Sequence, residues 1–386
     1  MGKHYLGLIS GTSIDGVDAV IVELDARACR LVAARTTPYP VELGKRVHAL
    51  IDAPSATLPE IGALDVALGR FFGACALALL RESGLDAQAI EAIGHHGQTI
   101  YHEPRGAEPF SMQLGDANVV AATTGIVTIA DFRRRDMAEG GQGAPLVPAF
   151  HEWMFRAAGE TRVVVNIGGI ANVTVLQPER ATVGFDTGPG NTLLDSWILR
   201  CRSVRFDRDG LWAASGTVDA DLLQELLREP YFALRAPKST GRELFNRLWL
   251  ERRLGNAGTR KPEDVQATLA ELTATTIAAA LAELSDYRLI VCGGGAYNSD
   301  LLARLSRLSG RVAESTAAHG IAPDWVEAAA FAWLARARLQ AIAGNVPSVT
   351  GARQTAVLGG VYYGAKPEIS SQQSESSRGR TESQTA

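Results

Sequence analysis

The sequence twice places a glycine-rich turn between two short runs of apolar, mostly β-branched residues. The first turn, SGTSIDG, lies between Tyr5–Ile9 and Val17–Leu24, and the second, IGG, lies between Arg162–Asn166 and Ala171–Leu176. A strand, a glycine-containing turn and a second strand are the signature of a β-hairpin. The two turns coincide at an offset near 157 residues. Two hairpins with chemically similar turns favour a duplicated α/β architecture of two lobes.

Apolar periodicity predicts the elements around these hairpins. A helix is expected over about 61–83, with Gly84 directly after its end. Further helices are expected over Pro262–Leu284 and Asp324–Ile342, and Leu289–Cys292 is expected to be a strand that runs into GGG. The alternation of strands and helices predicts an α/β fold.

A length of 386 residues indicates two or three domains. We expect lobe I to comprise residues 1–131 and 344–366, and lobe II to comprise residues 132–343. The last stretch, 367–386, contains Ser, Gln, Glu and Arg and almost nothing apolar. Such a segment buries too little surface to offset its ordering entropy, so a disordered tail is expected there.

Charge and cysteine content exclude several classes of protein. The net charge is −4 and no run of Lys or Arg occurs, which argues against a nucleic-acid or anionic membrane surface. The four cysteines are far apart, so neither a zinc site nor a disulfide framework is expected. The polar N-terminus does not resemble a signal peptide, and no apolar run approaches the ~18–20 residues of a membrane span. A cytoplasmic location is therefore expected.

The 39 glycines gather in four turns rather than in flexible stretches. These turns contain Gly11 and Gly16, Gly168-Gly169, Gly188 and Gly190, and Gly293-Gly294-Gly295. Glycine allows positive φ and a close approach of a ligand, and consecutive N–H groups can then converge on an anion. A single turn of this kind is more often a plain tight hairpin. Four turns in one chain favour phosphate binding, although no GxxxxGK[ST] or strand-linked GxGxxG motif occurs.

Asp186 is the strongest single candidate for catalysis. It lies in FDTGPGN at the end of an expected strand, before a turn and a helix. A carboxylate there can accept a proton from water or from a sugar hydroxyl, and N–H groups near Gly190 and Asn191 would offer an anion site beside it. The alternative is that Asp186 only forms the turn or caps the helix.

Three further segments carry candidate ligand-binding groups. HHGQTIYHEP is expected to be a polar loop whose Gln98 and Thr99 suit a sugar, since its histidine spacing matches no zinc pattern. In ADFRRRD, Arg133 is able to hold a carboxylate or phosphate in a bidentate manner. Glu327 lies in the first turn of an expected helix, where an acid also favours the helix dipole. A solvated surface is the alternative for each segment.

Taken together, the motifs resemble those of the bacterial anhydro-N-acetylmuramic acid kinases. Between Tyr5 and Gly364 the sequence contains, in order, ISGTSIDGVD, GHHGQTIYHEP, SMQLGD, ADFRRRDMAEGGQGAPLVP, NIGGIANVT, FDTGPGN, KSTGRELFN, CGGGAYN and VPSVTGA. Nine motifs in one order are far more specific than any single turn.

The resemblance implies the duplicated, actin-like (ribonuclease H-like) two-lobe ATPase fold of the sugar kinase/Hsp70/actin superfamily, with a central nucleotide cleft. It implies ATP, Mg²⁺ and the substrate 1,6-anhydro-N-acetylmuramic acid. Water opens the 1,6-anhydro bridge and O6 takes the γ-phosphoryl group, which gives N-acetylmuramic acid 6-phosphate in peptidoglycan recycling. A homodimer is also implied.

The same resemblance assigns roles to residues of this chain. Asp186 matches the general base and also a sugar contact. The sugar is expected to contact Thr99, Arg133 and Glu327, with Arg133 suited to the lactyl carboxylate. ATP is expected to be bound by Gly11, Thr12, Ser13, Ile14, Asp15, Gly16, Val17, Asp18, Gly168, Gly169, Gly293, Gly294 and Gly295.

One position departs from the wider superfamily. Many of its sugar kinases have an Asp two residues before the first glycine of the phosphate turn, where this chain has Ile9. No metal residue is therefore assigned. Two other functions compete with a kinase: a non-catalytic actin-like or chaperone-like ATP-binding module, and a glycosidase, which would need two catalytic carboxylates and no ATP.

Overall fold

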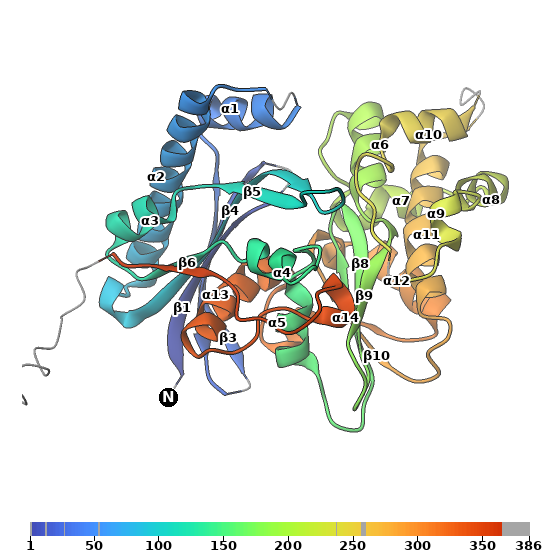
Figure 1. Cartoon of the computed structure of the whole chain (residues 1–386). Coiled ribbons are helices and arrows are strands. Elements are labelled where there is room, and N and C mark those ends of the chain that lie inside the picture. The colour runs from blue at the N-terminus through green and yellow to red at the C-terminus, as the bar shows by residue number, and fades with distance from the viewer. Residues whose placement is uncertain are drawn as a thin grey trace, which may run out of the picture.

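The computed structural model describes residues 2–11, 14–26, 28–52, 55–236, 238–255 and 260–364. The expected tail, 367–386, and the turn residues Thr12 and Ser13 lie outside these ranges. Figure 1 shows two lobes side by side, each built around its own β-sheet with helices against it. The α/β fold expected from the sequence is confirmed.

The sheet of the first lobe is built from the N-terminal hairpin. Strands β1, β2 and β3 pair antiparallel, and β4 and β6 continue the sheet parallel to β1. The strand order is β12-β6-β4-β1-β2-β3, with β5 paired to β4. The strands are β1 (Lys3–Ser10), β2 (Gly16–Leu24), β3 (Cys29–Pro38), β4 (Ile90–Glu103), β5 (Phe110–Leu114), β6 (Thr128–Ala130) and β12 (Gly360–Tyr362).

The sheet of the second lobe repeats this plan. Strands β7, β8 and β9 pair antiparallel, and β10 and β11 continue parallel to β7 in the order β11-β10-β7-β8-β9. The strands are β7 (Arg162–Ile167), β8 (Ile170–Leu176), β9 (Val183–Pro189), β10 (Arg288–Cys292) and β11 (Ala313–Ser315). The order β3-β2-β1-β4-β6 thus recurs as β9-β8-β7-β10-β11, which confirms the duplication that the two hairpins predict.

Helices cover both faces of each sheet. In lobe I, α1 (Val41–Asp52), α2 (Leu58–Ser83) and α3 (Ala117–Thr124) lie on one side, and in lobe II α11 (Pro262–Ala280) and α12 (Ser299–Ser309) do so. Between the sheets lie α5 (Val147–Phe155) and α13 (Val326–Leu339). The remaining helices are α4 (Arg133–Ala138), α6 (Thr192–Arg202), α7 (Leu211–Ser215), α8 (Ala220–Leu227), α9 (Pro230–Ala233), α10 (Arg247–Leu254) and α14 (Pro347–Thr350).

Alternation along the strands explains why both faces need cover. In β7, Val163 and Val165 pack on the side of α11 and α12, and Val164 packs on the opposite side. This period of two, apolar on both faces, is typical of a sheet buried on both sides. The apolar core between the sheets contains side chains of both lobes, including Val22 of β2 and Ile290 of β10.

The position of α13 bears on the lobe boundaries. This helix lies within 132–343, yet it packs against β1, β2 and β4 of the first sheet. The chain therefore returns to the first sheet at α13, before Gly344. The boundaries given above stay a prediction.

Helix α2 is apolar because it packs on the first sheet. It has a capping box between Thr57 and Glu60 and ends at Gly84, whose φ of 71° is left-handed. Within the described residues it is the one helix long and apolar enough to cross a membrane by length and composition. Its buried side, with Leu68 and Phe72, faces the protein core.

The prediction of a polar loop at HHGQTIYHEP is wrong for most of the segment, because β4 runs through it to Glu103. Pairing with β5 on one side and β1 on the other supplies the hydrogen bonds. Gly97, with φ of 76°, lies where the register with β1 shifts. The irregularity lets a polar sequence continue as a strand.

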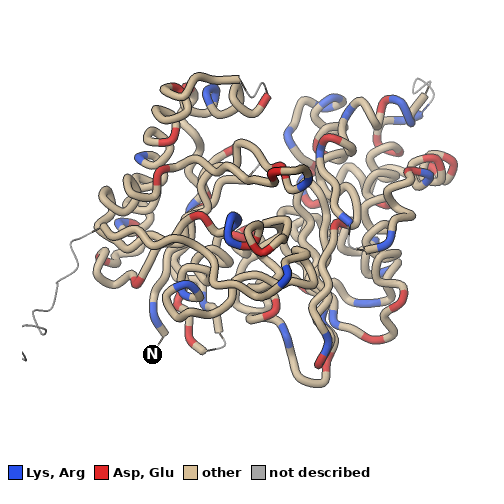
Figure 2. The backbone as a smooth tube through the Cα atoms, viewed as in Figure 1, with Lys and Arg blue, Asp and Glu red and all other residues tan. Residues whose placement is uncertain are grey.

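Basic and acidic residues are distributed over both lobes (Figure 2).

Candidate active site

A cavity of about 600 Å³ lies where the two glycine turns face each other. The carboxyl ends of β1 and β7 both reach it, and the start of α13 closes one side. Its lining residues are Ile9, Ser10, Gly11, Asp18, Thr36, His96, Thr99, Arg133, Asn166, Gly168, Gly169, Ile170, Asn172, Arg242, Gly293, Gly294, Pro323, Asp324, Trp325, Val326 and Glu327. Both copies of the repeated hairpin thus contribute to one site.

The Gly168-Gly169 turn is held by backbone hydrogen bonds from the start of α6. The N–H of Asn191 donates to Gly168 O at 2.8 Å, and the N–H groups of Gly190 and Thr192 donate to Gly169 O at 2.9 and 3.1 Å. The sequence predicts an anion site at the N–H groups of Gly190 and Asn191, and this prediction is wrong because both are already bonded to the turn. A Cβ on Gly190 would lie 2.3 Å from Gly168 O, so glycine is required there.

Because the carbonyls of this turn face α6, its N–H groups are left for the cavity. Within the described part of the chain, the N–H groups of Gly168 and Gly169 have no acceptor. The Arg242 guanidinium lies beside this turn, since a Cβ on Gly169 would be 3.2 Å from its Nη2. Two unpaired N–H groups and a guanidinium form a site suited to an anion.

The turn of the first lobe is held by side chains. The Ser10 hydroxyl donates to Gln98 Oε1 at 2.6 Å and lies 3.1 Å from Gly16 O. The Tyr39 hydroxyl also donates to Gln98 Oε1, at 3.3 Å, and Gln98 Nε2 lies 3.5 Å from Gly11 O. Gln98 is buried, so these bonds tie the turn to β4.

Asp186 lies beside the cavity rather than among its lining residues. It is the cross-strand partner of Asn172, which does line the cavity, so both side chains lie on one face of the sheet. The N–H of Thr240 donates to Asp186 Oδ2 at 3.0 Å. Among the described residues, Oδ1 has no donor and is free to accept a proton.

The protein raises the pKa of the Asp186 carboxyl to about 6. Burial is the main cause, the N–H of Thr240 opposes it, and the Glu243 carboxylate raises the pKa further. A carboxylate with a pKa near 6 is a stronger base than an ordinary Asp and is still ionised at neutral pH. This is the property that a general base needs.

Arg133 and Glu327 face the cavity from different elements. Arg133 Nη1 donates to Gly143 O at 2.8 Å, and its Nε and Nη2 approach His96 Nε2 at 3.1 and 2.8 Å. Burial lowers the pKa of Arg133 to about 10, so the group stays charged. Glu327 is exposed to solvent in the cavity. Desolvation by the surrounding protein nevertheless raises the pKa of its carboxyl, and the positive charge of Arg133 opposes this rise.

The loop that carries Gly143 is fixed by a buried carboxylate. Asp136 Oδ2 accepts from the N–H of Gly143 at 2.8 Å, and Oδ1 accepts from Asn345 Nδ2 and Thr350 Oγ1, both at 2.7 Å. Asp136 is fully buried. These bonds join α4 to the 345–350 segment and so hold the backbone that orients Arg133.

A second cavity, of about 770 Å³, adjoins the first at Gly294 and Asp324. It lies in lobe II and has both apolar and acidic walls, including Phe206 and Tyr297. Asp195 lies there, and burial raises the pKa of its carboxyl to about 7. Two cavities joined at a glycine loop, the second with apolar and aromatic as well as acidic walls, offer room for the phosphates and the base of a nucleotide, respectively.

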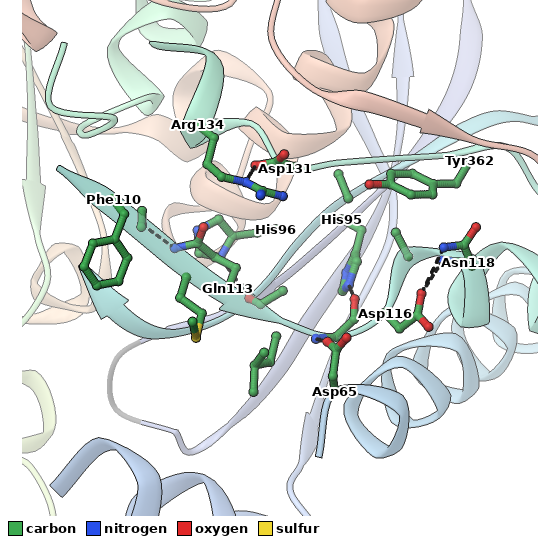
Figure 3. A pocket seen from close by; sticks show the side chains of 17 residues that line it. Asp65, His95, His96, Phe110, Gln113, Asp116, Asn118, Asp131, Arg134 and Tyr362 are labelled. Atoms are coloured by element: carbon green, nitrogen blue, oxygen red, sulfur yellow. Dashed lines mark hydrogen bonds and ion pairs between the residues drawn. The ribbon is translucent and has the colours of Figure 1, made fainter. Parts of the chain in front are cut away.

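A third cavity, of about 390 Å³, shares His96 with the cleft (Figure 3). Its walls include Asp65, Asp116 and the Asp131–Arg134 ion pair, in which Arg134 Nε lies 2.7 Å from Asp131 Oδ1. Each of these three carboxylates already accepts a hydrogen bond.

Relative to the cleft, the structure places the described predicted site residues in three ways. Those that line the cleft are Gly11, Asp18, Thr99, Arg133, Gly168, Gly169, Gly293, Gly294 and Glu327. Asp186 lies beside it, and the predicted residues away from it are Ile14, Asp15, Gly16, Val17 and Gly295. Ile14 and Val17 are buried in the core against α1 and α2. The ATP-binding roles of the whole turn stay a prediction.

Several cleft residues have no role in the sequence-based prediction: Ser10, His96, Asn166, Asn172, Arg242 and Asp324. Three of them lie within the sequence motifs quoted for the family: Asn166 and Asn172 belong to NIGGIANVT, and Arg242 belongs to KSTGRELFN. Their contact with the cleft depends on strand register and on a distant loop. No local pattern reports either.

The duplicated sheets and the cleft lined by glycine turns define a two-lobe ATPase of the actin-like, ribonuclease H-like fold, the class that includes sugar kinases. The model of the family "Anhydro-N-acetylmuramic acid kinase" matches residues 3–364. The chain belongs to this family, and it is therefore a kinase that uses ATP on the sugar 1,6-anhydro-N-acetylmuramic acid. The resemblance seen in the sequence is confirmed.

Curated relatives agree with the family. The anhydro-N-acetylmuramic acid kinase of Coxiella burnetii (strain RSA 493) is 50% identical over 369 residues, which cover 94% of this chain and 98% of that protein. The enzyme of the same name from Pasteurella multocida is 48% identical over 363 residues, covering 93% and 96%.

Solved structures are more distant. Component A of (R)-2-hydroxyglutaryl-CoA dehydratase from Acidaminococcus fermentans has a TM-score of 0.46 at 11% identity, covering 86% of this chain and 96% of that chain. The ROK hexokinase of Thermus thermophilus has a TM-score of 0.35 at 19% identity, covering 86% and 99%. The assignment of the fold therefore depends on the strand order of the two sheets.

Proposed function

We propose that this cleft couples hydrolytic opening of the 1,6-anhydro bridge to phosphorylation of O6, with Asp186 as the general base. The observation that carries the proposal is the Asp186 carboxylate itself. It lies beside the glycine turns, its pKa is raised to about 6, and Oδ1 has no described partner. Oδ1 takes the proton of a water molecule that attacks C1, and the C1–O6 bond then breaks.

The two glycine turns supply the second half of the reaction. As the C1–O6 bond breaks, O6 gains negative charge. O6 then attacks the γ-phosphorus, the bond from that phosphorus to the β,γ-bridging oxygen breaks, and ADP leaves. Phosphoryl transfer depends mainly on positioning and on charge stabilisation. The free N–H groups of Gly168 and Gly169, with Arg242 beside them, provide both on the lobe II side, while Gly293 and Gly294 border the adenosine side.

The sugar is proposed to lie against the lobe I wall. Thr99 offers a hydroxyl, Glu327 accepts hydrogen bonds from sugar hydroxyls, and Arg133 binds the lactyl carboxylate. Because Glu327 and Arg133 line the same cavity, this wall offers both a hydrogen-bond acceptor and a hydrogen-bond donor. A glycosidase would use two carboxylates and no nucleotide. The Glu243 carboxylate lies near enough to raise the pKa of Asp186, so it is the two glycine turns in the cleft that favour a kinase.

The residues present fit a magnesium ion. Asp18 and Asp324 line the same cavity, and each raises the pKa of another acid there: Asp324 that of Asp18, and Asp18 that of Glu327. Mg²⁺ is typically held by one or two carboxylates together with substrate phosphates. When bound, the ion would neutralise phosphate charge, with Asp18 and Asp324 as its carboxylate ligands, directly or through water.

The test is sugar-dependent ADP release with mass analysis of the product. The wild-type chain should convert ATP and 1,6-anhydro-N-acetylmuramic acid to ADP and N-acetylmuramic acid 6-phosphate. Asp186→Asn should lower kcat by about 10³-fold or more while the Kd for ATP changes little, because the base is lost and the turns remain. Asp221→Asn, on the exposed start of α8, is the matched control. Turnover retained in Asp186→Asn would remove the base from this mechanism.

A homodimer and a cytoplasmic location also belong to this proposal. Membership of the family supports both. Light scattering of the purified chain should give about twice the mass of 41.0 kDa, and a monomeric mass would remove the dimer.

A further inference from the structure

We propose that His96 is a positioning residue: it orients Arg133 without cancelling its charge, and so sets the preference of the cleft for a carboxylated sugar. The inference rests on the proposed function, in which Arg133 binds the lactyl carboxylate. His96 comes from β4 and Arg133 from α4, and both line the cleft.

The hydrogen bonds leave Arg133 one edge for a ligand. A guanidinium has five N–H groups. One on Nε and one on Nη2 point to His96 Nε2, at 3.1 and 2.8 Å, and one on Nη1 donates to Gly143 O at 2.8 Å. One N–H on Nη1 and one on Nη2 remain and are available to a carboxylate.

The tautomer and orientation of His96 are fixed by the protein. Its Nδ1 lies 2.9 Å from Gly97 O, which can only accept, so Nδ1 carries the proton and Nε2 carries the lone pair. The ring is 7% exposed and packs on Phe331, with ring centroids 4.6 Å apart. Burial and the charge of Arg133 hold the pKa of His96 well below its usual value, so the ring stays neutral.

The two neighbouring arginines of α4 show what is special about Arg133. Arg134 forms an ion pair with Asp131, visible in Figure 3, and Arg135 forms one with Glu139. Within the described residues, Arg133 forms no ion pair with a carboxylate, and its bonded partners are a neutral imidazole and a backbone carbonyl. Three consecutive arginines thus include one whose charge is left for a ligand.

The experiment compares the anhydro sugar acid with its methyl ester, which keeps the shape and lacks the charge. For the wild type, kcat/KM should favour the acid. His96→Leu removes the acceptor and should reduce this preference about tenfold or more, mainly through KM for the acid. His96→Gln places a carbonyl oxygen near the position of Nε2 and should retain most of the preference.

Two more variants separate positioning from mere packing. His96→Glu keeps an acceptor but neutralises Arg133, so it should also lower the preference for the acid. Arg133→Leu should abolish the preference, and adding His96→Leu to it should cause no further change in the ratio. His48→Leu, on the exposed side of α1, is the control and should leave both values unchanged.

Equal losses for acid and ester in His96→Leu, an unchanged preference in His96→Glu, or an additive double variant would each overturn the role of His96. These outcomes differ from failure of the proposed function, which would show as no sugar-dependent ADP release by the wild type.

Discussion

The two halves of the cleft come from the same repeated hairpin, yet they are held in place by different means. In lobe II, backbone N–H groups of α6 hold both carbonyls of the two-glycine turn. In lobe I, the turn from Gly11 to Asp15 is longer, and side-chain bonds among Ser10, Gln98 and Tyr39 hold it. A short turn can dock directly on a helix, whereas a longer one needs buried side chains to fix its base.

This contrast teaches where each half tolerates change. The lobe II turn depends on the absence of a Cβ at Gly190, which no other residue satisfies. The lobe I turn depends on single hydrogen bonds, which contribute about 1 kcal/mol each. A single substitution at Gly190 should therefore reduce activity strongly, whereas a single substitution among the hydrogen-bonding residues of the lobe I turn should reduce it only slightly.

Among the variants that compare the two turns, the largest effect should come from Gly190→Ala. Its Cβ would lie 2.3 Å from Gly168 O, so the turn must move away from α6. We expect kcat/KM for ATP to fall by about 100-fold. Gly62→Ala is the control, because Gly62 is exposed on α2 and an added Cβ would meet nothing within 4 Å. Similar losses in both variants would show that the close contact at Gly190 is not the cause.

The pH dependence of kcat/KM should come from a residue of lobe II, Asp186. Asp186 acts only when ionised, and its pKa is raised to about 6, so kcat/KM for the sugar should fall about tenfold per pH unit below pH 6. In lobe I, His96 has its pKa well below the usual value and should add no titration near pH 6. A pH–rate profile flat down to pH 4 would contradict the raised pKa.

The same shift has a consequence for stability. A carboxyl whose pKa is higher in the folded than in the unfolded chain destabilises the fold once it is ionised, from about pH 4 to 6 upward. Asp186→Asn should therefore have a Tm at neutral pH equal to or above that of the wild type, despite its lost activity. A clearly lower Tm would indicate that the carboxylate stabilises the fold.

A smaller effect is expected for Ser10→Ala in lobe I. The variant loses the 2.6 Å bond to Gln98 Oε1, while Tyr39 still donates to that oxygen. KM for ATP should rise about threefold to tenfold with little change in kcat. Ser55→Ala, at an exposed position before α2, is the control. A loss as large as that of Gly190→Ala would end the contrast between the two turns.

The smallest effect should come from removing residues 367–386. The polar composition of this segment gives it almost no apolar surface to bury against either lobe. Steady-state constants should stay within about twofold of the full chain. A larger change would show that the segment contacts the fold.

Local patterns predicted what local physics determines. The hairpins, the capped end of α2 at Gly84 and the strand that precedes Gly293 follow from periodicity and turn chemistry. The bulge at Gly97, which keeps β4 a strand, depends on pairing with two other strands. Pairing partners far along the chain leave no mark in a local window, so that segment was predicted to be a loop.

The residues of the site also fall into those that sequence motifs mark and those that only tertiary contacts place there. Gly168, Thr99 and Arg133 were found because motifs mark them, and the structure brings them to one cavity. Arg242 reaches the cavity from a loop that is distant in sequence. The N–H groups at the start of α6 donate to the carbonyls of a turn about twenty residues earlier. Both facts depend on tertiary contacts, which spacing and composition do not report.

The apolar core between the sheets has a consequence for each lobe taken alone. It contains Val22 of the first sheet and Ile290 of the second, joined by side chains of α5 and α13. One copy of the repeat on its own would leave this apolar face in water, at a cost of about 25 cal/mol for each Å² left uncovered. Either lobe produced as a separate chain should therefore associate through this face, with a second copy of itself or with the other lobe.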